Sequence, residues 1–215
     1  MKDYENLLDN IRFSAENIEK QISSYSLRFI QYRNQEVEFG IRFPMFLPCF
    51  YKYVIEKQVI PNQEQYGEIY IRENFSFFRF KNYSDDVIKG LKARLFRTYP
   101  SLVRDLHFCL MLKDSKKYNK VLYNTELDIQ EGIDVLIGCN HQLFAVNLYT
   151  NTMNACSVRN NKEFRHNKSK LYNYIELPVD FKGSKKCGNF FLYGDREMSN
   201  LNRIINLKVK QTVLN

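Results

Sequence analysis

A single acidic residue, Asp134, interrupts a part of the chain whose pattern is otherwise that of buried β-strand. Residues 132–137 and 143–149 are mostly apolar, and the polar residues 138–142 lie between them. Two short apolar runs joined by a polar turn predict a β-hairpin with a buried face. A carboxylate there needs a partner, because burying an unpaired charge is costly. We therefore expect Asp134 either to cap the hairpin or to belong to a functional site.

The positive charge of the chain is concentrated soon after this hairpin. The formal charge is +8, and residues 151–215 hold 12 Lys and Arg against 5 Asp and Glu. The basic residues nearest the hairpin are Arg159, Lys162, Arg165, His166, Lys168 and Lys170. A lone acid beside a basic surplus suggests a polyanionic partner, in the simplest case nucleic acid. A solvated basic face without a partner is the alternative.

Composition and motifs exclude several other classes. The five cysteines are scattered and form no Cys-x-x-Cys pair, which argues against a disulfide framework and a zinc site. The sequence has no phosphate-binding glycine loop, no His-Glu-x-x-His motif and no nucleophile elbow. Residues 1–5 do not resemble a signal peptide, and the apolar run 43–55 is interrupted and too short to cross a bilayer. We expect a cytoplasmic protein that does not use a membrane.

Residues 1–99 predict a mainly helical N-terminal region. Apolar residues recur at helical spacing over residues 3–36, and residues 50–57 predict a second helix. Residues 62–82 fit either strands or a helix, because aromatic and β-branched residues dominate a stretch without clear alternation. Ser84 followed by two acids predicts the start of a further helix.

Residues 100–215 predict an α/β core with the element order α-β-β-β-α-β-β-α. The first helix is expected to begin at Pro100, since proline is favoured in the first helical turn. The acidic residues 125–132 are expected to form a connection. The remaining predicted elements are strands at 120–123, 132–137, 143–149, 174–177 and 189–193, a helix over 154–168 and a closing helix from Ser199.

This order, together with Asp134 in the second core strand and a basic helix after the third, resembles the PD-(D/E)xK nuclease superfamily. The resemblance implies an α/β (α+β) fold in which a helical N-terminal region precedes a restriction-endonuclease-like core, a mixed sheet flanked by helices. It implies phosphodiester hydrolysis with Mg²⁺ or Mn²⁺. Asp134 matches the first acid of the motif. Asp105, on the helix expected from Pro100, would be an accessory metal ligand, although it could also pair on the surface with Arg104.

The second half of the motif departs from the family pattern. Residues i and i+2 of a strand share a face, and the face that should carry acid-x-Lys carries Asn147 and Tyr149 instead. Asn147 can offer a carbonyl oxygen to a metal, or it can be a structural amide. Tyr149 cannot replace an ammonium, so we expect Lys162 or Lys168 to supply it. Arg159, Lys162, Arg165 and His166 share one side of the expected basic helix and would contact nucleic-acid phosphates.

Two functions follow from this reading. The first is a metal-dependent DNA endonuclease, or a nuclease-like subunit of a larger complex. The alternative is a catalytically inactive nuclease-fold module that binds nucleic acid or a protein partner through its basic face. The helical N-terminal region is a further candidate surface for a protein partner.

Overall fold

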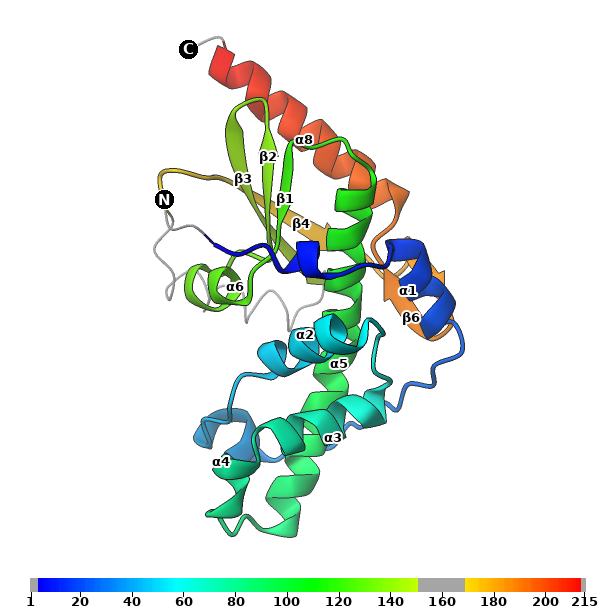
Figure 1. Cartoon of the computed structure of the whole chain (residues 1–215), viewed down its shortest axis with the longest axis vertical. Coiled ribbons are helices and arrows are strands. Elements are labelled where there is room, and N and C mark those ends of the chain that lie inside the picture. Colours follow the sequence, from blue (N-terminus) through cyan, green and yellow to red (C-terminus); the bar gives the residue numbers. More distant parts are fainter. Residues whose placement is uncertain (1–3, 151–168, 214–215) are drawn as a thin grey trace. The chain divides into compact units, whose positions relative to one another are not determined.

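The computed structural model describes residues 4–150 and 169–213 (Figure 1). The contacts of the chain divide it into two compact units. The core unit consists of the described residues within 1–15, 105–186 and 191–215, and the helical unit consists of residues 16–104 and 187–190. The division into domains at residues 99 and 100 stays a prediction. Nowhere in the described part of the chain is a helix long and apolar enough to cross a membrane.

The core unit is built on a mixed four-stranded sheet in the order β1-β2-β3-β4 (Figure 1). The strands are β1 (Lys120–Leu122), β2 (Val135–Cys139), β3 (Gln142–Thr150) and β4 (Asn173–Val179). The pairs β1–β2 and β2–β3 are antiparallel, and β3–β4 is parallel. The sheet and its flanking helices confirm the predicted α/β class. The helix predicted over residues 154–168 lies outside the described residues.

The turn between β2 and β3 has the backbone that a tight hairpin requires. Asn140 and His141 have φ angles of 49° and 61°, so both central residues adopt the left-handed conformation. Two such residues match the right-handed twist of the flanking strands. Cys139 pairs with Gln142 at the end of the ladder. The predicted hairpin is therefore confirmed.

The acidic residues before β2 form a helix, α6 (Thr125–Glu131), where the sequence predicted only a connection. The Asn124 side chain accepts hydrogen bonds from the backbone N–H groups of Glu126 and Leu127, and so caps the first turn. Gly132 has a φ of 69° and ends the helix in the left-handed conformation, where glycine is favoured. Because Gly132 belongs to this cap, β2 begins at Val135 and not at the predicted residue 132.

One face of the sheet packs against α6. Leu122, Leu136 and Ala145 lie side by side on β1, β2 and β3 because they pair in register. They form a buried cluster with Leu127 of α6 and with Tyr172. The residues that follow along this face of β3 are therefore Asn147 and Tyr149, as the alternation of the sequence predicted.

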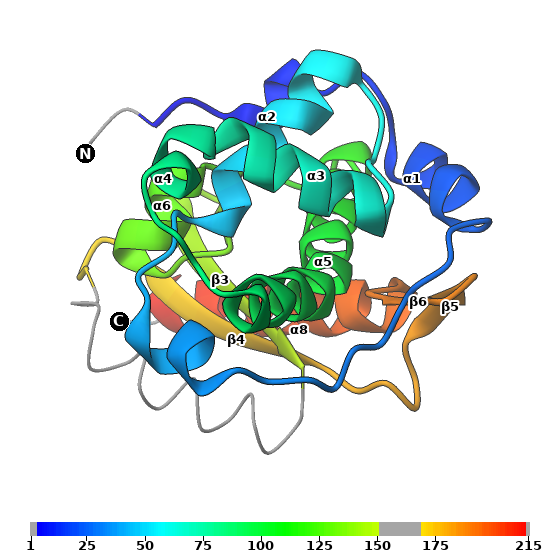
Figure 2. The same ribbon diagram turned by 90° about the horizontal axis from the view of Figure 1, so that it is seen from below.

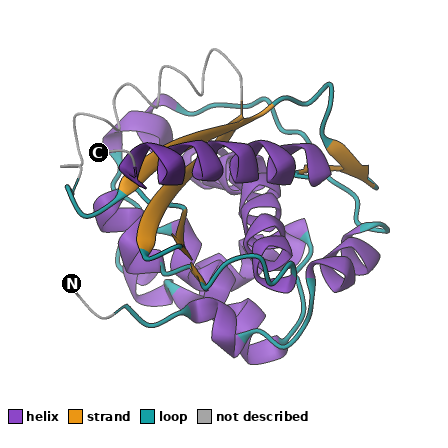
Figure 3. Ribbon diagram, turned by 90° about the horizontal axis from the view of Figure 1, so that it is seen from above, coloured by secondary structure: helices purple, strands orange, loops and turns teal. Residues whose placement is uncertain are grey.

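The last helix, α8 (Asp195–Val213), lies against β4 (Figure 3). It buries Leu201 and Ile205 and begins four residues before the predicted start. Between β4 and α8, the short strands β5 (Lys185–Cys187) and β6 (Phe190–Leu192) form a separate two-stranded sheet.

The long helix α5 (Asp85–Asp114) runs through Pro100, so the prediction that a helix begins at Pro100 was wrong. Proline cannot donate the helical hydrogen bond to the carbonyl four residues earlier, which here is Phe96. The buried Gln63 side chain replaces that donor, because its Nε2 lies 2.9 Å from the Phe96 oxygen. A side chain distant in sequence thus stabilises the helix where proline would interrupt it.

The helical unit begins with α1 (Ala15–Ile22) and the π-helical turn η2 (Glu36–Gly40). The helices α2 (Phe46–Lys57), α3 (Gln63–Glu73) and α4 (Phe75–Arg79) follow, and α3 packs against both of its neighbours (Figure 2). Of the two alternatives for residues 62–82, the helical one is therefore confirmed. The predicted helical N-terminal region is also confirmed.

Residues 3–36 were predicted to be helical, as one helix or as two, and this prediction was wrong for most of them. Among the described residues before η2, only η1 (Leu7–Asn10) and α1 are helical. Hydroxyl groups of Ser23 and Ser24 bond to carbonyls of the last turn of α1, a competing interaction that favours helix ends. The chain beyond is held without helix by side chains of α3 and α5. Gln63 accepts the Arg28 N–H at 2.7 Å, and Arg97 donates to the Tyr32 carbonyl at 2.6 Å.

Candidate functional site

Asp134 lies at the point where the β2–β3 ladder ends. Its Oδ2 accepts the backbone N–H of Leu148 at 2.6 Å. In the register of the ladder, the next residue to pair with Leu148 would be Ile133, so the carboxylate takes the place of a backbone acceptor. The same register puts Asp134 opposite Asn147. The predicted capping of the hairpin is thus observed, and it holds the carboxylate beside Asn147.

Asn147 in turn contacts a second carboxylate, on β4. Asn147 and Glu176 are paired across the parallel β3–β4 ladder, and Nδ2 of Asn147 donates to Oε1 of Glu176 at 3.2 Å. Residues paired across a ladder project from the same face of a sheet. Asp134, Asn147 and Glu176 therefore form a polar row across three adjacent strands, and each is partly buried. We call this row the oxygen row.

The carboxamide oxygen of Asn147 is the one buried atom of the row that lacks a partner. Within the described part of the chain, no donor lies within hydrogen-bonding distance of Oδ1, which is shielded from solvent. A buried carbonyl-type oxygen left without a partner costs about 1–3 kcal/mol. Such a buried oxygen calls for an explanation, and a water or an ion bound at that point would supply one.

The donors of the oxygen row fit a hard divalent cation. Two carboxylates and one amide oxygen are the ligand types that Mg²⁺ and Mn²⁺ prefer, and Mg²⁺ commonly retains several waters beside one or two carboxylates. The described residues contain no group of three His, Cys, Asp or Glu side chains that could hold a metal ion. A site formed here would thus depend on Asn147 as well as on the two acids.

Asp105 lies on α5, and its charge, like that of Asp134, affects the pKa of Cys109. Burial raises the pKa of the Cys109 thiol well above its ordinary value, and the negative charges of Asp105, Asp134 and Asp128 raise it further. Asp105 and Cys109 are one helical turn apart and so share a face of α5. The role of Asp105 as an accessory metal ligand stays a prediction.

The lysine of the family motif has no counterpart on β3. Tyr149 follows Asn147 on the same face and pairs with Pro178 of β4. The residues expected to compensate are Lys162 and Lys168, and those expected to contact nucleic acid are Arg159, Lys162, Arg165 and His166. All of them lie outside the described residues.

Glu176 was not among the residues predicted to form the site. Its sequence signal is the same as that of Asp134, because it is one acid between Ile175 and Leu177 in an apolar strand. What the sequence does not contain is the parallel register of β3 and β4, which brings Glu176 to Asn147.

A mixed sheet flanked by helices, with two acids and an amide in a row across adjacent strands, fits a nuclease-like protein with a restriction-endonuclease-like fold. A family model described as TaqI restriction endonuclease matches residues 1–185, and the chain belongs to that family. This confirms the resemblance to the PD-(D/E)xK nucleases and extends it over the helical N-terminal region. Membership makes the chain a nuclease-like protein that acts on DNA. No curated protein and no solved structure gave a significant match.

Proposed function

We propose that this protein is a metal-dependent DNA endonuclease and that the oxygen row holds its Mg²⁺ or Mn²⁺ ion. The observation that carries the proposal is the buried Oδ1 of Asn147, which has no partner among the described residues and lies between two carboxylates. In this site Glu176 supplies the second acid that β3 lacks. The bound ion would supply Lewis acidity and a more acidic water for phosphodiester hydrolysis.

The residues of the row have separate tasks in this proposal. The Leu148 N–H fixes Oδ2 of Asp134 and so orients the carboxylate beside Asn147. Glu176 holds the amide nitrogen of Asn147, which orients the amide oxygen away from Glu176 Oε1. Asp105 on α5 would add negative charge that favours cation binding. Lys162 or Lys168 would position the attacking water. Arg159, Arg165 and His166 would contact phosphates of the DNA backbone.

The second candidate function is a nuclease-fold module that binds nucleic acid, or a protein, without cutting. One observation favours it: Tyr149 occupies the β3 position where the family motif has lysine, and a phenol cannot serve as an ammonium. In that case Asp134 would act mainly as the cap of the β2–β3 ladder, and the basic segment after β3 would provide affinity.

Cleavage of supercoiled plasmid DNA with and without Mg²⁺ or Mn²⁺ tests the proposal. We expect metal-dependent nicking or linearisation by the wild-type chain, and its loss in Asp134→Asn and Glu176→Gln. Glu16→Gln is the matched control, because Glu16 is an exposed carboxylate on α1 with only a surface ion pair. DNA binding without cleavage under all metal conditions would instead support the non-catalytic module.

A further inference from the structure

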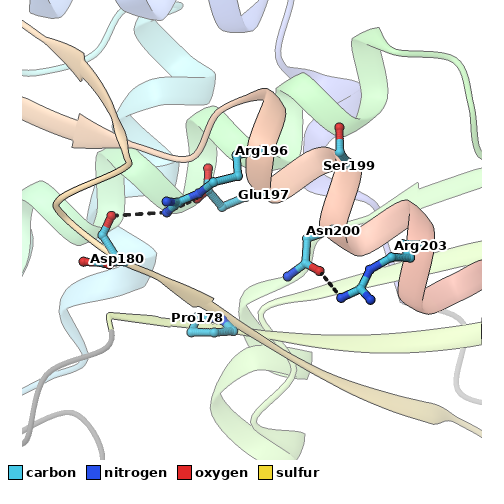
Figure 4. Close-up of a pocket in the computed structure, with 7 residues that line it drawn as sticks. All are labelled: Pro178, Asp180, Arg196, Glu197, Ser199, Asn200 and Arg203. Carbon is cyan, nitrogen blue, oxygen red and sulfur yellow. Dashed lines mark hydrogen bonds and ion pairs between the residues drawn. The ribbon is translucent and has the colours of Figure 1, made fainter.

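A cavity of about 520 Å³ lies between the end of β4 and the first turns of α8 (Figure 4). The residues that matter for its chemistry are Pro178, Asp180, Arg196, Glu197, Asn200 and Arg203. The α8 residues lie beyond residues 1–185, so membership of the family assigns them no role. The cavity is formed entirely within the core unit.

Glu197 is a buried carboxylate whose charge is already compensated. It is 3% exposed, its Oε2 accepts the Gly194 N–H at 2.9 Å, and its Oε1 accepts Nε of Arg196 at 2.8 Å. Nη2 of Arg196 adds an ion pair at 2.7 Å. Both carboxylate oxygens are therefore used, and Glu197 anchors the Arg196 guanidinium at the cavity instead of repelling an anion.

Arg203 provides the positive charge that is not compensated. Its Nη2 donates to Oδ1 of Asn200 at 3.0 Å, a neutral partner one turn earlier (Figure 4). Across the described residues, no carboxylate forms an ion pair with Arg203. Its remaining N–H groups are available in a planar arrangement that suits the oxygens of a phosphate.

Three lysines lie beside this cavity, one in the turn before β5 and two at the start of β5 itself. The Arg196 guanidinium lies against the Gly183 backbone, where a Cβ atom would come within 1.8 Å of Nη1. Gly183 stands between Lys182 and the pair Lys185 and Lys186, all exposed. The Asp180 carboxylate, the other acid of the cavity, accepts the Lys182 backbone N–H at 3.1 Å. Two acids and two arginines thus line the cavity, and the three lysines add positive charge beside it.

The cavity is also close to the oxygen row along the chain. Pro178, one of its walls, is two residues beyond Glu176 on β4, so the two residues lie on the same side of the strand. Two residues of a strand span roughly 7 Å. A DNA strand at the oxygen row would thus have its neighbouring backbone within reach of α8.

We propose that this cavity binds a backbone phosphate of the DNA substrate next to the cleaved position. Arg203 is the main contact, and Arg196 and the three nearby lysines, Lys182, Lys185 and Lys186, support it. The role is positioning, and it rests on the proposed function only for the identity of the neighbouring site. Arg203 binds one phosphate regardless of base sequence.

Binding of a fluorescent duplex DNA to the full chain, measured by anisotropy over a range of salt without divalent cations, tests this phosphate site. Removing one phosphate contact lowers the slope of log affinity against log salt by about one. We expect that change in Arg203→Ala, with affinity reduced roughly tenfold at low salt. Arg203→Lys should retain most of the slope. Lys117→Ala is the charge-matched control, since Lys117 is exposed in the turn after α5.

A wild-type slope in Arg203→Ala, or an equal loss in Lys117→Ala, would overturn the assignment, as would wild-type protein that binds no DNA at low salt. Circular dichroism of each variant separates loss of binding from loss of folding. Plasmid cleavage separates the two proposals. If Glu176→Gln cuts DNA normally while Arg203→Ala lowers the salt slope, the metal site is wrong and the phosphate site stands; the reverse pair of results rejects the phosphate site alone.

Discussion

Asn147 donates a hydrogen bond from Nδ2 to Oε1 of Glu176 across the β3–β4 ladder, at 3.2 Å. This bond determines which atom of the Asn147 carboxamide has no hydrogen-bond partner among the described residues. A flipped amide would set its oxygen against a carboxylate oxygen, which is unfavourable. The atom without a partner among the described residues is therefore the carbonyl oxygen, the end that can bind a cation.

Glu176→Gln tests that arrangement. A glutamine keeps the size of the side chain but removes the negative charge and allows the Asn147 amide to turn over. We expect metal-dependent cleavage to fall by roughly 100-fold or more, with a melting temperature close to that of the wild type. Steady-state cleavage and thermal unfolding should be measured on the same preparation. Wild-type cleavage by this variant would remove Glu176 from the site.

Asp134→Asn and Asp134→Ala separate the two roles of this residue. The asparagine oxygen can still accept the Leu148 N–H, so the end of the ladder should persist and stability should change little. Alanine leaves that N–H without its acceptor and should cost about 1 kcal/mol of unfolding free energy. If the oxygen row binds Mg²⁺, the ion should raise the melting temperature of the wild type, and both variants should lose that rise. If Asp134→Asn retains that rise, the metal site does not include Asp134.

Local signals in the sequence were sufficient to predict the β2–β3 hairpin. Two apolar runs around a polar turn specify β2 and β3, and Asn140 tolerates the backbone that the turn demands. The same signals placed Asp134 and Asn147 near each other, because neighbouring strands in a hairpin have a register fixed by the turn.

Features that depend on distant residues were not predictable. Glu176 reaches Asn147 only because β3 and β4 pair in parallel. The register of that pair cannot be read from the sequence of the segment that connects the two strands. Similarly, Pro100 marks a helix start by every local rule, and Gln63 of α3 makes the continuous helix possible. The expected helix over residues 3–36 failed for the same reason, since tertiary hydrogen bonds from Gln63 and Arg97 hold residues 28–32 outside a helix.

A double-mutant cycle tests the compensation between Gln63 and Pro100. Gln63→Ala alone should cost about 2–3 kcal/mol, because the Phe96 carbonyl and the Arg28 N–H both lose their partner in a buried place. In the Pro100→Ala background, the new backbone N–H can bond to Phe96 in the ordinary helical way. The cost of Gln63→Ala should therefore shrink by about 1 kcal/mol there, as measured by urea unfolding. If Gln63→Ala lowers the free energy of unfolding equally in both backgrounds, the Gln63 side chain does not replace the N–H that Pro100 lacks.

Thiol labelling tests the burial of Cys109 on α5. The pKa of Cys109 is raised by burial and by three nearby carboxylates, so the protonated thiol persists in the folded protein to higher pH than in the unfolded chain. Alkylation requires the thiolate. At pH 8 to 9 we expect Cys139 and Cys187, which are partly exposed, to react with iodoacetamide while Cys109 stays unmodified until the protein is unfolded in urea. Peptide mass spectrometry reads each site separately. Rapid labelling of Cys109 in the folded chain would show that this part of the core opens to solvent.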